Sequence, residues 1–285
     1  MPHIKAFFDT VTGTVSYLVW DSETRAAAII DPVLDYEPHS ASLSTGSADT
    51  ILSAARELDL DISWVLETHA HADHLTAAHH IQSETGARIG IGRHITDVQK
   101  IFSPIFGASD VTPDGHVFDH LFADGDTFQI GNQEVRVLHT PGHTPACVSY
   151  LIGDAVFVGD TLFMPDYGTA RADFPGGDAA TLYRSIQKLL ALPPQTRVFV
   201  GHDYLPEGRD TPAWETTIAQ QRAQNRHVHT GISEEEFVKM RSARDATLAA
   251  PRLILPSLQV NIRAGAMPPP EEDGHTYLKI PVNRL

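Results

Sequence analysis

Residues that can bind a transition metal follow four apolar, strand-like runs in this sequence. One run leads into the segment Thr-His-Ala-His-Ala-Asp-His at positions 68–74, and the other three lead into Gly-His, Gly-Asp and Gly-His dipeptides. Neutral imidazoles combined with carboxylates suit zinc or a first-row transition metal, whereas magnesium and calcium prefer oxygen ligands alone. We therefore expect a metal site with His69, His143 and Asp160 as ligands. His71, Asp73, His74 and His202 are further candidates, either as ligands, as groups that support the ligands, or as residues of a vacant second site.

The spacing within positions 68–74 supports this expectation. His69 and His71 are two residues apart in an extended segment, so their side chains point the same way and can face one metal. A His-x-His pair alone is weak evidence, but the compound motif at several strand ends is strong. The alternative is that Asp73 only caps a helix starting near Leu75 and that the histidines are ordinary core or surface residues.

The runs that precede these residues must be strands of a sheet, because loops at one edge of a rigid sheet are where functional groups collect. We expect strands at Ile4–Phe8, Val15–Trp20, Ala26–Ile30, Ile62–Glu67, Arg88–Gly92, Thr127–Ile130, Glu134–Leu138, Val148–Ile152, Ala155–Val158 and Arg197–Val200. Helical patterns occur at Ala48–Leu58, Leu75–Thr85, Thr96–Phe102 and Ala179–Leu190. Strands that alternate with helices in this way predict an α/β fold with sheet layers covered by helices.

The C-terminal quarter has a different character. We expect a catalytic domain at residues 1–212 and a helical appendage at 213–285, with polar helix from about Trp214 and again over Glu234–Leu248. The tail passes through three prolines at 268–270 to the apolar, strand-like run Tyr277–Val282. This tail could pack on its own domain or on a second subunit, so a homodimer is one alternative.

Charge and cysteine content limit the classes of partner. A formal net charge of −15 over 285 residues disfavours nucleic acid and anionic membranes, because the field of the protein repels polyanions. The first residues show no signal or transit peptide, and no apolar run is long enough to span a membrane. The single cysteine, Cys147, excludes an intrachain disulfide and is expected to be a buried apolar residue. These features predict a cytoplasmic protein.

The motif at 68–74, with His143, Asp160 and His202, resembles the metal motifs of the metallo-β-lactamase superfamily. The resemblance implies an αββα sandwich with the metal site at one edge of its two sheets. Within that superfamily the chain is most similar to persulfide (sulfur) dioxygenases and to glyoxalase II thioesterases, and especially to the bacterial β-lactamase-like hydrolases. The stretches Gly168–Phe174 with Thr181–Tyr183, and Gly201–Tyr204, carry the closer match to the dioxygenases.

The resemblance to the dioxygenases implies one iron(II) held by His69, His143 and Asp160. The remaining ligand-type residues would leave a second site empty, and Asp73 and His71 would be catalytic groups beside the ligands. The implied activity is oxidation of a low-molecular-weight thiol persulfide, such as glutathione persulfide, by O₂ to sulfite. In glyoxalase II enzymes the same residues hold two zinc ions bridged by the counterpart of Asp160, and they hydrolyse a thioester. A third reading is a non-catalytic metal-dependent sensor or sulfur-carrier partner.

The substrate contacts are expected from Arg171, Tyr204 and Arg222. Dioxygenases of the mitochondrial type hold the glutathione carboxylate with an arginine in the stretch matching Asn225 to Val228. In this sequence the matching position is His227, and Arg226 precedes it. A different low-molecular-weight persulfide is therefore an alternative substrate.

Overall fold

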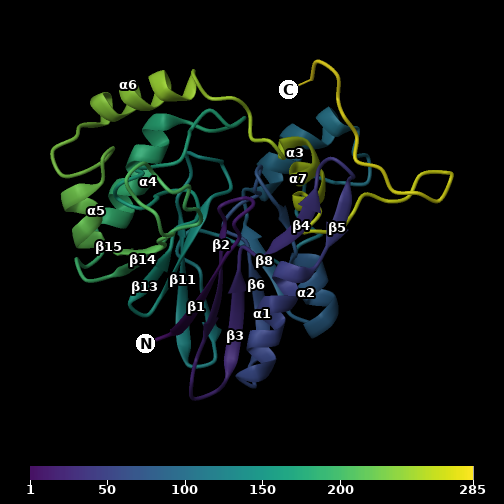
Figure 1. The fold of residues 1–285 in the computed structure, drawn as a ribbon, viewed down its shortest axis with the longest axis horizontal. Helices are drawn as coiled ribbons and strands as arrows, with labels where there is room; N and C mark the ends of the chain where they lie inside the picture. The colour runs from purple at the N-terminus through teal and green to yellow at the C-terminus, as the bar shows by residue number, and fades with distance from the viewer. Residues whose placement is uncertain (285) are drawn as a thin grey trace.

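Two six-stranded sheets form the centre of the molecule in the computed structural model, which describes residues 1–284 (Figure 1). The first sheet has the order β1-β2-β3-β6-β8-β9, with β1 (His3–Phe8), β2 (Val15–Trp20), β3 (Ala26–Ile30), β6 (Asp61–Leu66), β8 (Arg88–Gly92) and β9 (His120–Phe122). Strands β1 to β3 are antiparallel, and β3, β6, β8 and β9 are parallel. The parallel strands end at one edge of the sheet, where the loops after them can meet.

The second sheet is mostly antiparallel. Its order is β10-β11-β12-β13-β14-β15, with β10 (Thr127–Ile130), β11 (Gln133–His139), β12 (Val148–Ile152), β13 (Ala155–Phe157), β14 (Arg197–Phe199) and β15 (Glu215–Thr217). Gly131 and Gly153 begin two-residue hairpin turns with φ of 58° and 57°, a left-handed conformation that glycine adopts readily. A small third sheet contains β4 (Val33–Glu37), β5 (Ser42–Ser44) and β7 (Leu75–Thr76).

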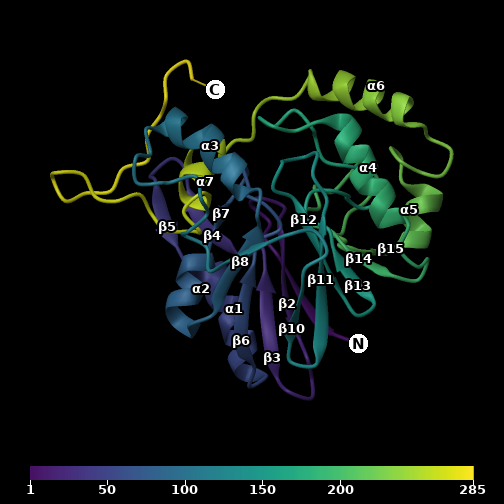
Figure 2. The ribbon, with the colours of Figure 1, turned by 180° about the vertical axis from the view of Figure 1, so that it is seen from behind.

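Helices cover the outer faces of the two large sheets, as Figures 1 and 2 show from opposite sides. On the first sheet lie α1 (Gly46–Glu57), α2 (Ala78–Thr85), α3 (Ile95–Phe106) and α7 (Ile254–Asn261). On the second lie α4 (Ala179–Leu190) and α5 (Ile218–Gln224), and α6 (Glu234–Asp245) packs against α4. The architecture is therefore an αββα sandwich, as expected. Within residues 1–284, no helix combines the length and the apolar character needed to cross a membrane.

Local sequence explains where the outer helices begin. Asp178 accepts a hydrogen bond from the backbone N–H of Thr181 (2.7 Å) at the start of α4, and Ser233 with Glu236 forms a capping box at the start of α6. In α4 the buried residues recur at helical spacing, from Leu182 through Ile186 to Leu189. The helix therefore turns one apolar face to the second sheet.

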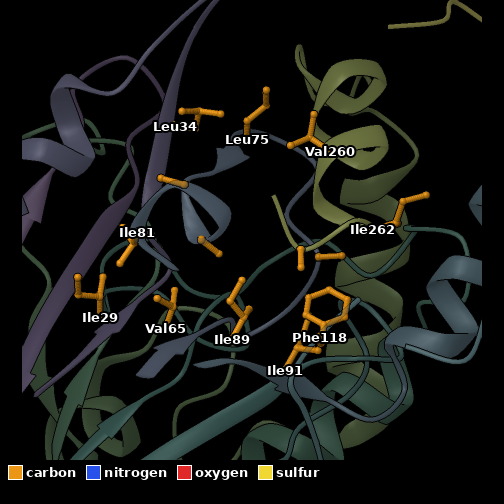
Figure 3. Close-up of a cluster of buried hydrophobic side chains, with 14 of the residues drawn as sticks. Ile29, Leu34, Val65, Leu75, Ile81, Ile89, Ile91, Phe118, Val260 and Ile262 are labelled. Atoms are coloured by element: carbon orange, nitrogen blue, oxygen red, sulfur yellow. The ribbon is translucent and has the colours of Figure 1, made fainter. Parts of the chain in front are cut away.

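Three apolar clusters hold these layers together. Between the sheets, Tyr17, Phe157 and Phe199 pack edge to face or stacked, with ring centroids 5.1–5.5 Å apart. A second cluster lies between the first sheet and its helices, and it contains Val260 and Ile262 at the end of α7 together with Leu75, Ile89 and other strand residues (Figure 3). The C-terminal quarter of the chain therefore contributes to the core of the N-terminal sheet.

Several expectations about individual elements differ from the structure. The run Leu75–Thr85 is not one helix: Leu75–Thr76 pairs with β4 as strand β7, and α2 starts only at Ala78. Asp73 consequently does not cap that helix, since Ala77 is the N-cap residue. Tyr277–Val282 forms no strand in the described part of the chain. The helix expected over Glu234–Leu248 ends at Asp245.

Candidate metal centre

The loops that follow β6, β11, β13 and β14 meet at one edge of the sandwich. They carry His69, His143, Asp160 and His202, and all four side chains are buried. Gly159, with φ of 48°, turns the chain directly before Asp160, and a Cβ at this position would collide with the side chain of Thr68. The structure thus brings together the four strand ends that the sequence singled out.

The first group of ligand-type residues is His69, His143 and Asp160, whose ligand atoms all lie within 4.8 Å of one another. The Nδ1 of His143 donates to the carbonyl oxygen of Arg171 (2.8 Å), and the Nδ1 of His69 lies 3.0 Å from the hydroxyl of Thr68. Both rings are thereby fixed with Nε2 available as a metal-binding atom. Burial, reinforced by the positive charge of His71, lowers the pKa of His69 and keeps its ring neutral.

The second group contains His71, Asp73, His74 and His202, and it also satisfies the 4.8 Å limit. The hydroxyl of Thr14 lies 3.3 Å from Nδ1 of His74 and 3.5 Å from Nδ1 of His202, which leaves both Nε2 atoms directed to the centre of the group. Asp73 Oδ2 is 3.2 Å from Nε2 of His202. The structure therefore also places every candidate of the second site together.

Asp160 lies between the two groups. Its Oδ2 is 3.8 Å from Nε2 of His143 in the first group, and its Oδ1 is 3.5 Å from Nε2 of His202 in the second. One carboxylate thus presents one oxygen to each group, which is the position of a bridging ligand.

Two buried carboxylates, those of Asp31 and Glu67, contact the imidazole of His71. The Nε2 of His71 lies 3.0 Å from Asp31 Oδ1 and 3.4 Å from Glu67 Oε2. Although burial alone would lower the pKa of His71, these two carboxylates raise it well above the ordinary value. Burial raises the pKa of Glu67, whose Oε1 accepts a hydrogen bond from Thr76 (2.5 Å). Asp31 also accepts two hydrogen bonds from Thr68, so the same carboxylate fixes both ends of the His-x-His segment.

Several buried polar atoms in both groups have no hydrogen-bond partner among residues 1–284. They are Nε2 of His69, His74 and His202, Nδ1 of His71, Oδ2 of Asp73 and Oδ1 of Asp160. Leaving one such atom unsatisfied costs about 1–3 kcal/mol, so a cluster of them points to a missing ligand. Imidazole nitrogens and carboxylate oxygens fit iron or zinc, and the residues present therefore suit the metal that the sequence predicts.

The metal groups form part of the wall of a cavity of about 910 Å³. Asp73, His143 and Asp160 line it, and the segment 246–253 that crosses from α6 to α7 forms another part of the wall. Ligand sites of this size range bury most of a small molecule. Because these ligand groups face a cavity, they fit a catalytic metal site better than a structural site closed to small molecules.

The three residues expected to contact substrate have different surroundings. Tyr204 lines the cavity and stacks on the ring of His202, with centroids 5.2 Å apart. Arg171 also lines the cavity, but its guanidinium group already binds Asp173 and the carbonyl oxygen of Ala249. Arg222 lies outside the cavity lining, because its guanidinium donates to the carbonyl oxygen of Leu190.

Sequence reasoning missed several residues of the site. Glu67 is four residues before His71, a spacing that carries no signal in an extended segment. Arg241 and Arg244 line the cavity from α6, and their helix looked only like a polar, solvated element. Asn261 binds the backbone of the metal loop from α7, and no local motif indicates such a contact.

Comparisons with known proteins agree with this geometry. A family model described as the metallo-beta-lactamase superfamily matches residues 9–202. A beta-lactamase hydrolase-like protein of Agrobacterium fabrum is 52% identical over all of this chain and 66% of its own length, so this chain spans about two thirds of that relative. Glyoxylase B2 of Dictyostelium discoideum is 48% identical over 99% of this chain and 97% of its own length.

Two further matches extend the comparison to more distant relatives. The human mitochondrial persulfide dioxygenase ETHE1 is 31% identical over 93% of this chain and 90% of its own length. The crystal structure of ETHE1 from Myxococcus xanthus has a TM-score of 0.74 at 34% identity, covering 93% of this chain and 100% of that one. The fold, the converging ligand groups and these matches together show that the chain belongs to the metallo-beta-lactamase superfamily.

Proposed function

We propose that this protein is a non-haem iron dioxygenase that oxidises a low-molecular-weight thiol persulfide, such as glutathione persulfide, to sulfite. The observation that carries the proposal is the group of two imidazoles and one carboxylate, His69, His143 and Asp160, in the wall of the cavity. Such a set leaves adjacent coordination positions open and is characteristic of iron(II) oxygenases. Similarity to the human and Myxococcus ETHE1 proteins supports this choice.

The residues of the chain have separate tasks in this reaction. His69, His143 and Asp160 would hold one iron(II), which supplies the redox chemistry that activates O₂. The cavity brings persulfide and O₂ together in one oriented arrangement in place of a chance encounter. Tyr204 closes one side of the cavity beside His202, and Asp31 keeps the His-x-His segment in place. One persulfide, one O₂ and one water then give a thiol, sulfite and two protons.

A second candidate is hydrolysis of a glutathione thioester by a binuclear zinc site. It is favoured by the complete second group, in which unpaired atoms of Asp73, His74 and His202 surround a common point beside Asp160. Two zinc ions at these groups would supply a hydroxide nucleophile and polarise the thioester carbonyl. The similarity to glyoxylase B2 supports this alternative.

One preparation can separate the two activities. Protein produced without added zinc should contain about one iron per chain and should consume O₂ with glutathione persulfide, releasing sulfite in equal amount. It should cleave S-lactoylglutathione slowly. Two firmly held zinc ions per chain, with fast thioester cleavage and no O₂ uptake, would establish the hydrolase in place of the dioxygenase.

Substitutions in the two ligand groups provide an independent test. His143→Ala should lose both iron and O₂ uptake, because it removes one of three iron ligands. His74→Ala should retain iron and measurable O₂ uptake, with a loss of about 10- to 100-fold typical of groups that only support the ligands. If His74→Ala loses metal and activity as completely as His143→Ala, a binuclear site is the better description.

A further inference from the structure

The cavity beside the metal groups has two sides of different chemical character. The side formed by α6 is polar, because Arg241 and Arg244 line it. His227 is close to both arginines, and its Nδ1 accepts a hydrogen bond from the backbone N–H of Thr169 (3.1 Å). The other side, which we call the apolar wall, comes from β4 and the segment that leads into α7, and these elements lie away from α6 (Figure 2). The residues of the apolar wall are Tyr36, Pro38, Pro251, Leu253 and Ile254.

Strand pairing brings the apolar wall next to the metal groups. Strand β7 starts at Leu75, two residues after Asp73, and Leu75 lies opposite Leu34 of β4. Tyr36 is two residues further along β4, so its side chain lies on the same face of that strand as Leu34. Leu34 is buried in the cluster beside the first sheet, and Tyr36 packs against the same cluster. The apolar wall therefore begins on the strand that pairs with the end of the metal loop.

The start of α7 continues the apolar wall. This helix packs on β7, and its first residue, Ile254, packs against the same apolar cluster as Tyr36. Leu253 precedes it and is buried. Pro38 and Pro251 contribute ring carbons and have no backbone N–H, so these two positions offer no hydrogen-bond donor to a ligand. The wall thus presents mainly carbon surface.

This carbon surface is accessible from the cavity. Four of the five wall side chains are only half-buried, although they lie beside the core. Within residues 251–254, Arg252 is the one charged side chain of the cavity lining, and its charge contributes to the lowered pKa of Glu37. Because removal of apolar surface from water is favourable, a ligand that covers this wall gains affinity from it.

We propose that the apolar wall is a subsite for an aliphatic or aromatic group of the substrate, and that it selects thiols that carry such a group. The proposal rests on the proposed function only in placing a thiol-derived sulfur at the metal groups. A short carbon chain on that sulfur would extend from the metal loop along the apolar wall. Glutathione has no aliphatic or aromatic side chain and would leave this subsite empty.

Thiols of increasing length test the apolar wall without turnover. We would measure calorimetric affinities of the iron(II)-loaded protein, in the absence of O₂, for ethanethiol, propanethiol and butanethiol. Wild-type affinity should rise about three- to fourfold for each added methylene, the gain expected when a CH₂ group is buried. In 3-mercaptopropanol a hydroxyl replaces the end methyl of butanethiol. It should bind about 10-fold more weakly than butanethiol, because the hydroxyl loses its hydrogen bonds with water at the apolar wall.

Substitutions assign this gain to the apolar wall. Ile254→Thr and Tyr36→Thr each remove carbon surface, so each should reduce the gain per methylene to less than about twofold and leave the affinity for ethanethiol unchanged. Ile254→Val is a conservative change that should keep most of the gain, which separates loss of carbon surface from damage to the fold. Ile280→Thr makes the matched exchange at a tail residue that is 77% exposed and lies outside the cavity lining, and it should bind like wild type.

The proposal fails if wild-type protein binds the three thiols equally or binds none of them, or if the wall variants keep the full gain. It also fails if the wall variants weaken ethanethiol and butanethiol alike. Failure of the dioxygenase proposal would look different, because O₂ uptake would be absent with every persulfide while the length-dependent affinities remained. Loss of both would reject the two proposals together.

Discussion

His227 is a histidine that folding keeps neutral. Its pKa falls from an ordinary 6.5 to about 4 because of burial and three neighbouring arginines. The unfolded chain therefore binds more protons than the native protein between these two values, so native stability is lost as the pH falls from about 6.5 towards 4. His227→Asn keeps an acceptor for the Thr169 N–H and removes the titration.

Urea unfolding of the metal-free protein at several pH values measures this effect. The midpoint should fall less steeply between pH 6.5 and 4 for His227→Asn than for wild type, while the two proteins should show parallel behaviour above pH 7. Equal slopes in the acidic range would mean that His227 titrates normally in the native state.

Cys147 behaves as a buried apolar residue with a nearly inert thiol. Burial raises its pKa to about 12, and it lies against Thr144 rather than in the cavity lining. Because the thiolate is the reactive form, native protein at pH 8 should show no thiol reactive to a disulfide reagent, and the same protein in denaturant should show one. Rapid native labelling would contradict the burial of this side chain.

The ligands could be predicted from the sequence because each follows a short apolar strand and, for His143, Asp160 and His202, a glycine. That pattern depends on local sequence alone. The roles of Glu67 and Arg244 could not be predicted, because each depends on where distant elements lie: Glu67 through its contact with the imidazole of His71, and Arg244 through the packing of α6 over the cavity. The predicted contact between Arg222 and the substrate is not supported by the position of Arg222, because its guanidinium group donates to the carbonyl oxygen of Leu190.

At the scale of elements, α7 connects the end of the chain to the metal loop. The buried Asn261 donates to the carbonyl oxygens of His71 (2.8 Å) and His74 (2.8 Å), and it accepts from the backbone N–H of Thr76 (2.9 Å). Gly265 follows closely, where a Cβ would lie 3.0 Å from the carbonyl oxygen of Thr76. One side chain thus fixes both ends of the segment 71–76.

Removing this connection should weaken metal binding. Asn261→Leu leaves three buried backbone groups unpaired, which should destabilise the metal-free protein by about 3 kcal/mol in urea unfolding. Its metal affinity should fall by about 10- to 100-fold in a competition titration with a chelator, at a temperature where the variant remains folded.

Gln259→Ala is the matched control, because Gln259 lies on the same helix but hydrogen-bonds to Lys279 in the tail. This variant should keep wild-type metal affinity. Unchanged affinity in Asn261→Leu would show that the loop holds its shape without α7.

The large sheets were predictable because their strands have clear β-rich patterns with turn residues between them. Helix α7 was not, since it has only eight residues and contains Pro256 in its first turn, where a proline is tolerated but gives no sign of a helix. The error at Leu75–Thr85 has a similar origin: Leu75 and Thr76 fit the helical pattern, yet pairing with Val33 and Leu34 makes them a strand.

At the scale of the whole molecule, the last residues form an extended tail that projects beyond the sandwich, drawn in yellow in Figure 1. Its contacts with the rest of the chain are few. The backbone of Lys279 bonds to Gln259 at 2.8 and 2.9 Å, Arg284 donates to the carbonyl oxygen of Pro104 (3.3 Å), and Met267 and Leu278 are partly buried in the cluster beside the first sheet. The metal groups and Asn261 all precede it.

Deleting residues 266–285 should therefore destabilise the fold only moderately and should leave the metal centre intact. We expect a loss of about 2–4 kcal/mol in the free energy of unfolding, from three hydrogen bonds and the partly buried Met267 and Leu278, with unchanged metal content. A truncation after Leu248, which also removes α7, is the contrasting control and should abolish metal binding. Loss of metal in the shorter deletion would assign the tail a role at the site.

The contact between Asn261 and the metal loop also has a consequence for biosynthesis. Chains fold from the N-terminus as they emerge from the ribosome. In this 285-residue chain the loop at 71–76 emerges from the ribosome long before Asn261 is synthesised. During that interval the ligands of the loop are present, but the side chain that fixes their backbone has not been made. Durable metal capture is therefore a late event, and nascent chains stalled before α7 should release metal to a chelator that completed chains resist.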